Sequence, residues 1–180
     1  NHRIRQIEYI RKTGYCRVSC LAGLCGNSTL SATLSHFIST PHSGYADGPG
    51  AVSRFSAPQG VAFLDDGYVV VADTGNFLIR LVTRNGSTWT LAGSTASGMD
   101  DANGNPSAGC PPPCLRGVPG YRDGNLSYAQ FKNPVMVARG PNNTVILTDE
   151  NRIRLIEFPN IITHFFGINS MGRVSTIAGE

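Results

Sequence analysis

The sequence predicts an all-β fold built from repeated antiparallel units, and three observations support this prediction. Segments 44–93 and 120–180 carry the same order of short motifs, and segment 1–23 carries the second half of a further copy. Asp73 of the first full copy corresponds to Asp149 of the second, and the neighbouring motifs of the two copies are separated by the same number of residues. No window shows a convincing helical period. Repeats of this length indicate a radial or solenoid architecture.

Four short strands are predicted in each full unit, and segment 44–93 shows them most clearly. Its first strand ends at residues 65–67, because Asp and Gly tolerate the positive φ of a tight turn. Its second strand is a nearly continuous apolar run, as expected for a strand covered on both faces. A tight reversal at 73–76 follows, and Asn85-Gly86 is a hairpin signal between the last two strands. The predicted strands are 61–64, 68–72, 78–83 and 87–92.

Four-stranded antiparallel units repeated radially describe a β-propeller, which typically needs about 4 to 8 blades. The predicted divisions are the second half of a blade at 1–23, an insertion loop at 24–43, a second blade at 44–93, a Cys/Pro/Gly-rich insertion loop at 94–119, and a third blade at 120–180 with an extended hairpin at 157–172. Two and a half blades cannot close a ring, and open blade faces expose apolar strands. We therefore expect an incomplete propeller that continues on both sides or is completed by neighbouring copies.

Two motifs carry a resemblance to a known family. Asn1-His2 leads into Arg3-Ile4-Arg5, and a Val-Ala-Asp-Thr-Gly-Asn segment ends at Asn76. Both resemble the NHL-repeat family, and the resemblance implies a β-propeller of NHL type. The third unit departs from the pattern, with Met136 where the second has Gly60 and a shorter turn between its second and third strands. The family includes RNA-binding propellers and is similar to an amidating lyase in which histidines from several blades hold zinc.

The cysteines indicate whether the protein resides in an oxidising or a reducing compartment. Zinc sites favour Cys-x2-Cys spacing with a second matching pair, and this chain has Cys-x3-Cys pairs without such a partner. Disulfides in an oxidising compartment are favoured over metal ligands and over scattered core thiols. The odd count leaves one thiol free or bonded elsewhere, and Cys25 to one of the later pair is a plausible bridge. The disulfide candidates are Cys16, Cys20, Cys25, Cys110 and Cys114.

Sequons for N-linked glycosylation favour the same compartment. All of them fall in predicted loops, where sugars of a secreted protein belong, although two are also explained as turns. Charged residues make up only 15% of the chain, which suits an extracellular surface covered by sugar. No signal peptide and no apolar run of membrane-spanning length is visible. The predicted glycosylation sites are Asn27, Asn85, Asn125 and Asn142.

The long hairpin of the third unit is a candidate interaction surface, because exposed apolar patches mark contact surfaces. The alternative is that this hairpin folds over its own blade. The apolar residues concerned are Phe158, Ile161, Ile162, Phe165, Phe166 and Met171.

Sites for chemistry are weak in this sequence. The four histidines do not recur at one repeat position, so no converging metal or acid–base set is expected. Asp101, Asn103 and Asn105 form a weak calcium candidate, although Pro112 stands where an EF-hand needs a bidentate acid. No catalytic residues, other metal or cofactor is expected.

One arginine does recur at the same strand position of each unit, as Arg5, Arg80 and Arg154. These arginines are expected to bond loops and neighbouring blades. RNA is the less favoured partner, because the net charge of +3 is weak for phosphate binding.

The sequence favours a non-enzymatic extracellular or cell-surface glycoprotein segment that serves assembly, adhesion or protein–protein interaction, with a filament subunit as one specific version. Its expected partners are copies of itself or the remaining blades of a longer chain, and N-linked glycans, with no nucleic acid. The alternatives are a closed propeller with an axial ligand or lyase-type catalytic site, and an RNA-binding NHL propeller.

Overall fold

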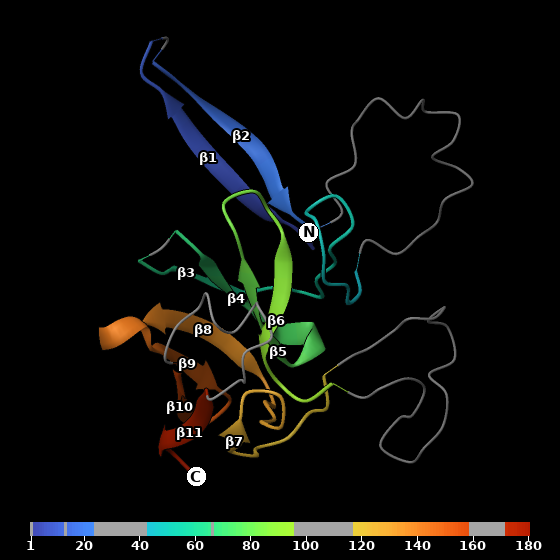
Figure 1. Cartoon of the computed structure of the whole chain (residues 1–180), viewed down its shortest axis with the longest axis vertical. Helices are drawn as coiled ribbons and strands as arrows, with labels where there is room; N and C mark the ends of the chain where they lie inside the picture. Colours follow the sequence, from blue (N-terminus) through green and yellow to red (C-terminus); the bar gives the residue numbers. More distant parts are fainter. Residues whose placement is uncertain (1, 13, 24–42, 66, 96–116, 159–171) are drawn as a thin grey trace, which may run out of the picture.

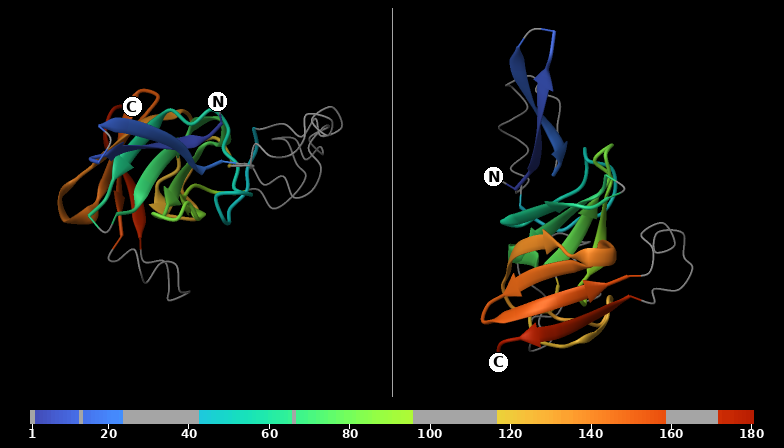
Figure 2. Two further views of the ribbon diagram at one scale, coloured as in Figure 1. Left: turned by 90° about the horizontal axis from the view of Figure 1, so that it is seen from above. Right: turned by 90° about the vertical axis from the view of Figure 1, so that its left-hand side faces the viewer.

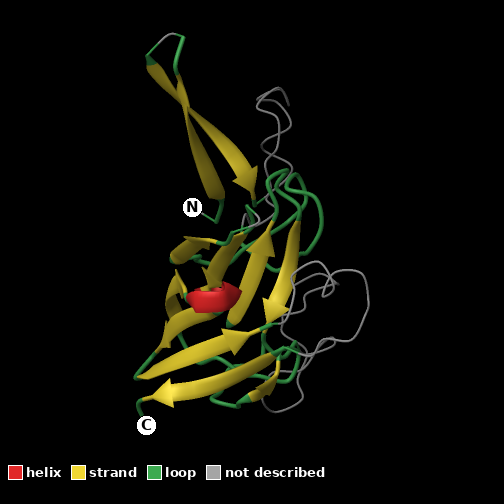
Figure 3. Ribbon diagram, turned by 60° about the vertical axis from the view of Figure 1, so that its left-hand side comes forward, coloured by secondary structure: helices red, strands yellow, loops and turns green. Residues whose placement is uncertain are grey.

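In the residues that it describes, the computed structural model is an all-β structure of three antiparallel sheets (Figure 1, Figure 3). Figure 2 shows that the sheets follow one another along the long axis in chain order. The structure describes residues 2–12, 14–23, 43–65, 67–95, 117–158 and 172–180.

The first sheet is a two-stranded hairpin of β1 (Ile4–Ile10) and β2 (Tyr15–Ala22). Ile4 pairs with Ala22 and Arg5 pairs with Cys20, so a register shift lies between Ile4 and Arg5. The hairpin extends beyond the other two sheets at one end of the molecule (Figure 1).

The second sheet has the order β3-β4-β5-β6, and its strands lie within a residue of the predicted bounds. Strands β4 and β5 are buried along their whole length, which confirms the prediction that β4 is covered on both faces. The predicted reversal is a 3₁₀ turn, η1 (Thr74–Asn76), and Phe77 closes it in the left-handed region at φ 58°. The strands are β3 (Gly60–Phe63), β4 (Val69–Asp73), β5 (Leu78–Val82) and β6 (Thr88–Ala92).

The third sheet repeats this order and adds one short outer strand. The main strands are β8 (Pro134–Arg139), β9 (Val145–Asp149), β10 (Arg152–Glu157) and β11 (Arg173–Ala178), with the 3₁₀ turn η2 (Pro141–Asn143) between β8 and β9. Strand β7 (Gly124–Asn125) pairs with the edge of β11 that faces away from β10. In the second unit, Gly48 makes the equivalent bridge to Thr88 of β6.

Gly60 and Met136 show why the two units differ in their first strands. Strands β3 and β8 lie against each other, and a Cβ on Gly60 would come within 2.3 Å of the Val135 carbonyl oxygen. Only glycine permits that backbone approach. Met136 is exposed, and the β8–β9 register shifts between Pro134 and Val137 around it. The departure at Met136 is therefore an irregular start to β8, after which the ladder resumes.

Two apolar clusters hold the sheets together. Val69 and Val71 of β4 belong to the cluster formed with the β1–β2 hairpin, whereas Val70 and Ala72 belong to the larger cluster formed with the third sheet. Successive side chains of a strand point to opposite faces. The continuous apolar run of β4 is thus explained by packing on both sides.

Candidate functional site

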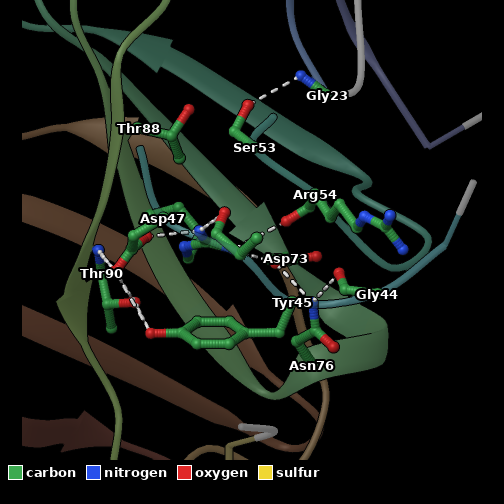
Figure 4. Close-up of polar contacts among 12 residues, drawn as sticks. Gly23, Gly44, Tyr45, Asp47, Ser53, Arg54, Asp73, Asn76, Thr88 and Thr90 are labelled. Carbon is green, nitrogen blue, oxygen red and sulfur yellow. Dashed lines mark hydrogen bonds and ion pairs between the residues drawn. The ribbon is translucent and has the colours of Figure 1, made fainter. Parts of the chain in front are cut away.

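Arg80 of β5 is a buried arginine in the second sheet. Figure 4 labels several of the residues that contact it, among them Asp47 and Asp73. The Arg80 Nη1 group donates to Asp73 Oδ2 at 2.8 Å and to the Arg54 carbonyl at 3.1 Å. Its Nη2 group donates to the Ala46 carbonyl at 2.9 Å and to Asp47 Oδ1 at 2.5 Å. The guanidinium thus ties two carboxylates and two loop carbonyls to strand β5.

The two carboxylates in turn fix the backbone around them. Asp73 Oδ1 accepts the Ser56 N–H at 2.7 Å, and its Oδ2 accepts the Asn76 side-chain N–H at 2.7 Å. Asp47 Oδ2 accepts both the backbone N–H and the hydroxyl of Thr90 on β6 at 3.1 Å. The network therefore joins the loop before β3 to strands β4, β5 and β6.

Aromatic rings cover the guanidinium of Arg80. Its Cζ lies 4.7 Å from the Tyr45 ring centroid and 5.2 Å from the Phe55 centroid, within the range of cation–π attraction. The Tyr45 hydroxyl bonds with Thr90 Oγ1 at 2.8 Å. Burial raises the pKa of Tyr45, against the hydrogen bond with Thr90.

The third unit repeats the same network around Arg154. Its Nη1 donates to Asp149 and its Nη2 donates to Asp123, both at 2.8 Å. Its other acceptors are the Gln130 carbonyl at 3.1 Å and the Arg122 carbonyl at 3.0 Å. The Nε atoms of both arginines are buried and have no hydrogen-bond partner among the residues that the structure describes. The repeated sequence pattern is therefore a repeated structural network.

The role predicted for the arginines is partly confirmed. Arg80 and Arg154 bond loops, as expected, but their acceptors among the described residues belong to their own units rather than to neighbouring blades. Sequence reasoning did not assign Asp47 and Asp123 as their partners. The signal was present, because both aspartates stand in the Gly-Tyr-x-Asp-Gly motif that opens each full unit.

One carboxylate in each network, Asp73 and Asp123, has a shifted pKa. Burial raises the pKa of Asp73, although the Arg80 charge and the hydrogen bonds from Asn76 and Ser56 oppose the shift. Burial also tends to raise the pKa of Asp123. The hydrogen bonds from Thr176 and the charge of Arg154 outweigh burial, so the pKa of Asp123 lies below its ordinary value.

The lowered pKa of Asp123 gives a testable pH dependence. A depressed pKa means that the folded state favours the carboxylate, so its stabilisation is complete above the unfolded pKa of about 3.9 and is lost as pH falls through the folded pKa. We expect Asp123→Asn to flatten the acid decline in free energy of unfolding, measured by urea denaturation between about pH 2 and pH 6. Thr176→Val, which removes only the hydroxyl bond, should flatten it less. If the free energy of unfolding fell equally with pH in Asp123→Asn and in the wild type, the lowered pKa of Asp123 would be contradicted.

Arg5 of the first unit stands where Arg80 and Arg154 stand in the others. It pairs with Cys20 of β2 as Arg80 pairs with Thr90 and Arg154 with Thr176. Arg5 is exposed, and within the described ranges no carboxylate forms an ion pair with it.

A groove of about 570 Å³ lies between the β1–β2 hairpin and the second sheet. On the hairpin side it is lined by Ile4, Arg5, Gln6, Ile7 and Leu21. On the second sheet it is lined by Val61, Phe63, Gly67, Val69 and Arg84. This mostly apolar groove, with Arg5 at its wall, is the candidate functional site, and sequence reasoning did not locate it.

The cysteine predictions are only partly within the described residues. Cys16 is exposed and free, so it is not a disulfide partner in this structure. Cys20 is disulfide-bonded. Cys25, Cys110 and Cys114 lie outside the described residues, and a bridge from Cys25 to one of the later pair stays a prediction.

Three of the predicted glycosylation sites are described, and their side chains are exposed. Asn85 lies in the β5–β6 turn, where its Oδ1 accepts the Ser87 N–H at 3.2 Å. Asn125 lies in β7, and Asn142 lies in η2 with a left-handed φ of 54°. Asn27 falls outside the described residues. Exposure permits modification, and occupancy remains a prediction.

The candidate interaction hairpin can be judged only at its first residue. Phe158 is buried in the cluster between the second and third sheets, so it does not contribute to an exposed patch. The other residues of that candidate surface lie outside the described part of the chain: Ile161, Ile162, Phe165, Phe166 and Met171.

The candidates for metal binding and acid–base chemistry form no site among the described residues. His2 uses its Nδ1 to accept the Ala57 N–H at 2.9 Å, and the other histidines are not described. The calcium candidates Asp101, Asn103 and Asn105 are likewise not described. In the part of the chain that the structure describes, no three His, Cys, Asp or Glu side chains are placed to hold a metal. Those residues also contain no helix long and apolar enough to cross a membrane.

Comparison with known proteins identifies the repeat. Residues 55–80 match the model of the NHL repeat, and no curated protein matches the chain. Similar solved structures include auxiliary nutrient binding proteins from Bacteroides thetaiotaomicron (18% identity, TM-score 0.54) and Bacteroides ovatus (18%, 0.55), each matched over 98% of this chain and 33% of its own. A candidate phosphatase from Bacteroides thetaiotaomicron (19%, 0.56) is matched over 100% of this chain and 31% of its own.

These likenesses concern the fold. The chain spans about a third of the length of the solved structures it matches. It contains an NHL repeat at residues 55–80 and has an all-β fold of the propeller type, which the residues that the structure describes do not close into a ring.

Proposed function

We propose that this propeller segment is a non-enzymatic protein-interaction module of a secreted or cell-surface glycoprotein. The observation that carries the proposal is the apolar groove beside the β1–β2 hairpin, because exposed apolar patches mark contact surfaces. The buried arginines do not compete with this role, because their charge is used to hold the loops of each blade. They are also not positioned to contact RNA phosphates, since both are completely buried.

The first strands of the blades support a non-enzymatic role. Strands β3 and β8 run side by side, with the sequences Gly-Val-Ala-Phe and Pro-Val-Met-Val-Ala-Arg. Neither strand contributes a histidine or carboxylate, which metal-assisted and acid–base chemistry usually require. Any ligand at the propeller axis would meet mainly apolar side chains and backbone on these two strands.

Among the possible interactions of this module, we favour head-to-tail assembly of copies of the chain. Ile7 of the hairpin is exposed at one end of the stack of sheets, and Met136 and Ile177 are exposed on the sheet at the other end. Contacts between two different surfaces give open filaments when the rotation does not close a ring. The extracellular placement is supported by the exposed sequons and by the disulfide of Cys20.

Secretion of the chain from eukaryotic cells tests this proposal. Intact mass should fall on deglycosylation, and Asn85→Gln and Asn142→Gln should each remove one glycan. Asn133→Gln is the matched control, because Asn133 is exposed but precedes proline and is no sequon. Light scattering and negative-stain imaging should show assemblies that grow with concentration. An unmodified, monodisperse monomer would contradict both parts of the proposal.

A further inference from the structure

We propose that the contact between the β1–β2 hairpin and the second sheet contains a pH-sensitive latch, which is closed while His2 is neutral and opens when His2 gains a proton. The latch is the hydrogen bond from the backbone N–H of Ala57 to the imidazole of His2. This inference goes beyond the proposed interaction function, and it depends neither on glycosylation nor on assembly of copies of the chain.

The hydrogen bond requires a neutral imidazole. His2 accepts it through Nδ1, which lies 2.9 Å from the backbone nitrogen of Ala57. In neutral histidine one ring nitrogen carries the proton and the other accepts, whereas in protonated histidine both nitrogens donate. Protonated His2 would therefore face the Ala57 N–H with a second donor, and the bond would be lost. Because histidine ordinarily changes charge between about pH 5 and pH 8, mild acid is enough to open the latch.

His2 lies where the hairpin meets the second sheet. A Cβ on Gly23, directly after β2, would come within 2.5 Å of the His2 carbonyl oxygen and 3.2 Å of the Phe55 ring. The Gly23 N–H donates to Ser53 Oγ at 3.0 Å. The bond to Ala57 therefore joins the segment before β1 to the same loop that packs against the end of β2.

The latch holds Ala57 in a strained backbone conformation. Its φ is 45°, in the left-handed region that residues other than glycine, asparagine and aspartate rarely adopt. Pro58 follows it, and a residue before proline favours extended backbone. Such strain persists only where the surrounding structure holds it, and the bond to His2 supplies such a hold.

The third unit shows a relaxed arrangement of the same loop. Asn133 precedes Pro134 there, as Ala57 precedes Pro58 in the second unit. The Asn133 N–H donates to Asp149 Oδ1 at 2.7 Å, and Asn133 is not in the left-handed region. An aspartate at the end of the second strand can therefore take the place that His2 holds in the second unit.

Asp73 is the corresponding aspartate of the second unit. Its Oδ1 accepts the Ser56 N–H at 2.7 Å, as Asp149 Oδ1 accepts the Lys132 N–H at 2.8 Å. Once His2 is protonated, the Ala57 N–H can turn to Asp73 Oδ1 and the strain is released. The latch thus has two discrete states and a local charge change that selects between them, as a switch requires. Since the hairpin forms one wall of the groove, the latch couples pH to the shape of that surface.

Charged groups on the elements around His2 set the pH at which the latch opens. Positive charges disfavour a proton on His2, and a carboxylate favours it. The carboxylate of Asp73 is itself paired with Arg80. The charged groups concerned are Arg3 and Arg5 on the hairpin, Arg54 in the facing loop, and Asp73 with Arg80 in the second sheet.

NMR titration between about pH 5 and pH 8 tests the latch directly. We expect neutral His2 to carry its proton on Nε2, and the Ala57 amide proton to shift with the same midpoint as the His2 ring. The Asn133 amide is the matched internal control, because it bonds an aspartate and should not follow the His2 titration. An Ala57 amide that does not respond when His2 titrates overturns the inference.

Two substitutions should each hold the latch in one state. His2→Asn keeps an acceptor oxygen near the position of Nδ1 and removes the titrating ring. His2→Phe removes the acceptor and supplies the side chain that Phe77 places at the equivalent position of the second unit. The other histidines remain in both variants, so differences from the wild type are due to His2.

Hydrogen exchange at about pH 7.5 and about pH 5.5, corrected for the intrinsic exchange rate, measures the effect on the hairpin. In the wild type, protection of the β1 and β2 amides should be lower at the acidic pH by roughly two- to tenfold, as expected for the loss of one hydrogen bond. Protection should be independent of pH in both variants, and higher in His2→Asn than in His2→Phe. Unchanged protection of β9 and β10 shows that each variant is folded. A pH-independent wild type, or a loss of wild-type size in either variant, overturns the inference.

Discussion

Replacing Arg80 with glutamine is expected to lower the free energy of unfolding by about 3–5 kcal/mol, the range for breaking a buried ion pair from one side. The change leaves Asp73 fully buried beside a neutral side chain, and it removes donors from the carbonyls of Ala46 and Arg54. Burial already raises the pKa of Asp73 against the pull of Arg80. Without Arg80 that pKa should rise further, so the deficit of the variant should shrink as pH falls.

Urea unfolding at neutral pH and near pH 4 measures both effects. Arg139→Gln is the matched control, because the Arg139–Asp65 pair is exposed and such pairs contribute about 0–1 kcal/mol. Adding Asp73→Asn to Arg80→Gln should recover part of the loss, since no buried charge is then left unpaired. Equal losses for Arg80→Gln and Arg139→Gln would show that the buried network is dispensable.

The strands and reversals were predictable because they depend on local chemistry. The apolar run of β4 and the reversal at η1 need only neighbouring residues, and both lie where the sequence placed them. The network was only half predictable. The recurrence of Arg80 is visible in the sequence, but its bonds to Asp47 and the Ala46 carbonyl join residues 33 and 34 positions apart and have no local signal.

The groove was not predictable for a different physical reason. A sequence pattern shows which strands are present, whereas this site arises where β1, which pairs only with β2 among the described strands, lies beside exposed residues of β3. Phe158 illustrates the same limit. The sequence left open whether the apolar hairpin that begins at Phe158 is exposed or folds over its own blade, and Phe158, directly after β10, lies in the cluster between two sheets. Burial is decided by packing between units, which composition alone does not give.

Phe55→Ala should be comparably destabilising, at about 3–5 kcal/mol, and should act mainly where the hairpin meets the second sheet. Phe55 is fully buried in the cluster that contains Ile4 and Ala22 of the hairpin. Its ring also lies 5.2 Å from the Arg80 guanidinium, so truncation removes both an apolar contact and a cation–π contact. The resulting cavity weakens the attachment of β1 and β2 to the rest of the chain.

Hydrogen exchange can separate local from global loss. In Phe55→Ala, the amides of β1 and β2 should lose more protection than those of β9 and β10, because Phe55 packs in one cluster with Ile4 and Ala22 of the hairpin. Phe131→Ala is the matched comparison, since Phe131 makes the same 5.2 Å contact with Arg154 but belongs to the cluster between the second and third sheets. Phe63→Ala, at an exposed ring, should change the free energy of unfolding by no more than about 0.5 kcal/mol. Uniform loss of protection in Phe55→Ala would mean that the hairpin and the two full sheets unfold as one unit.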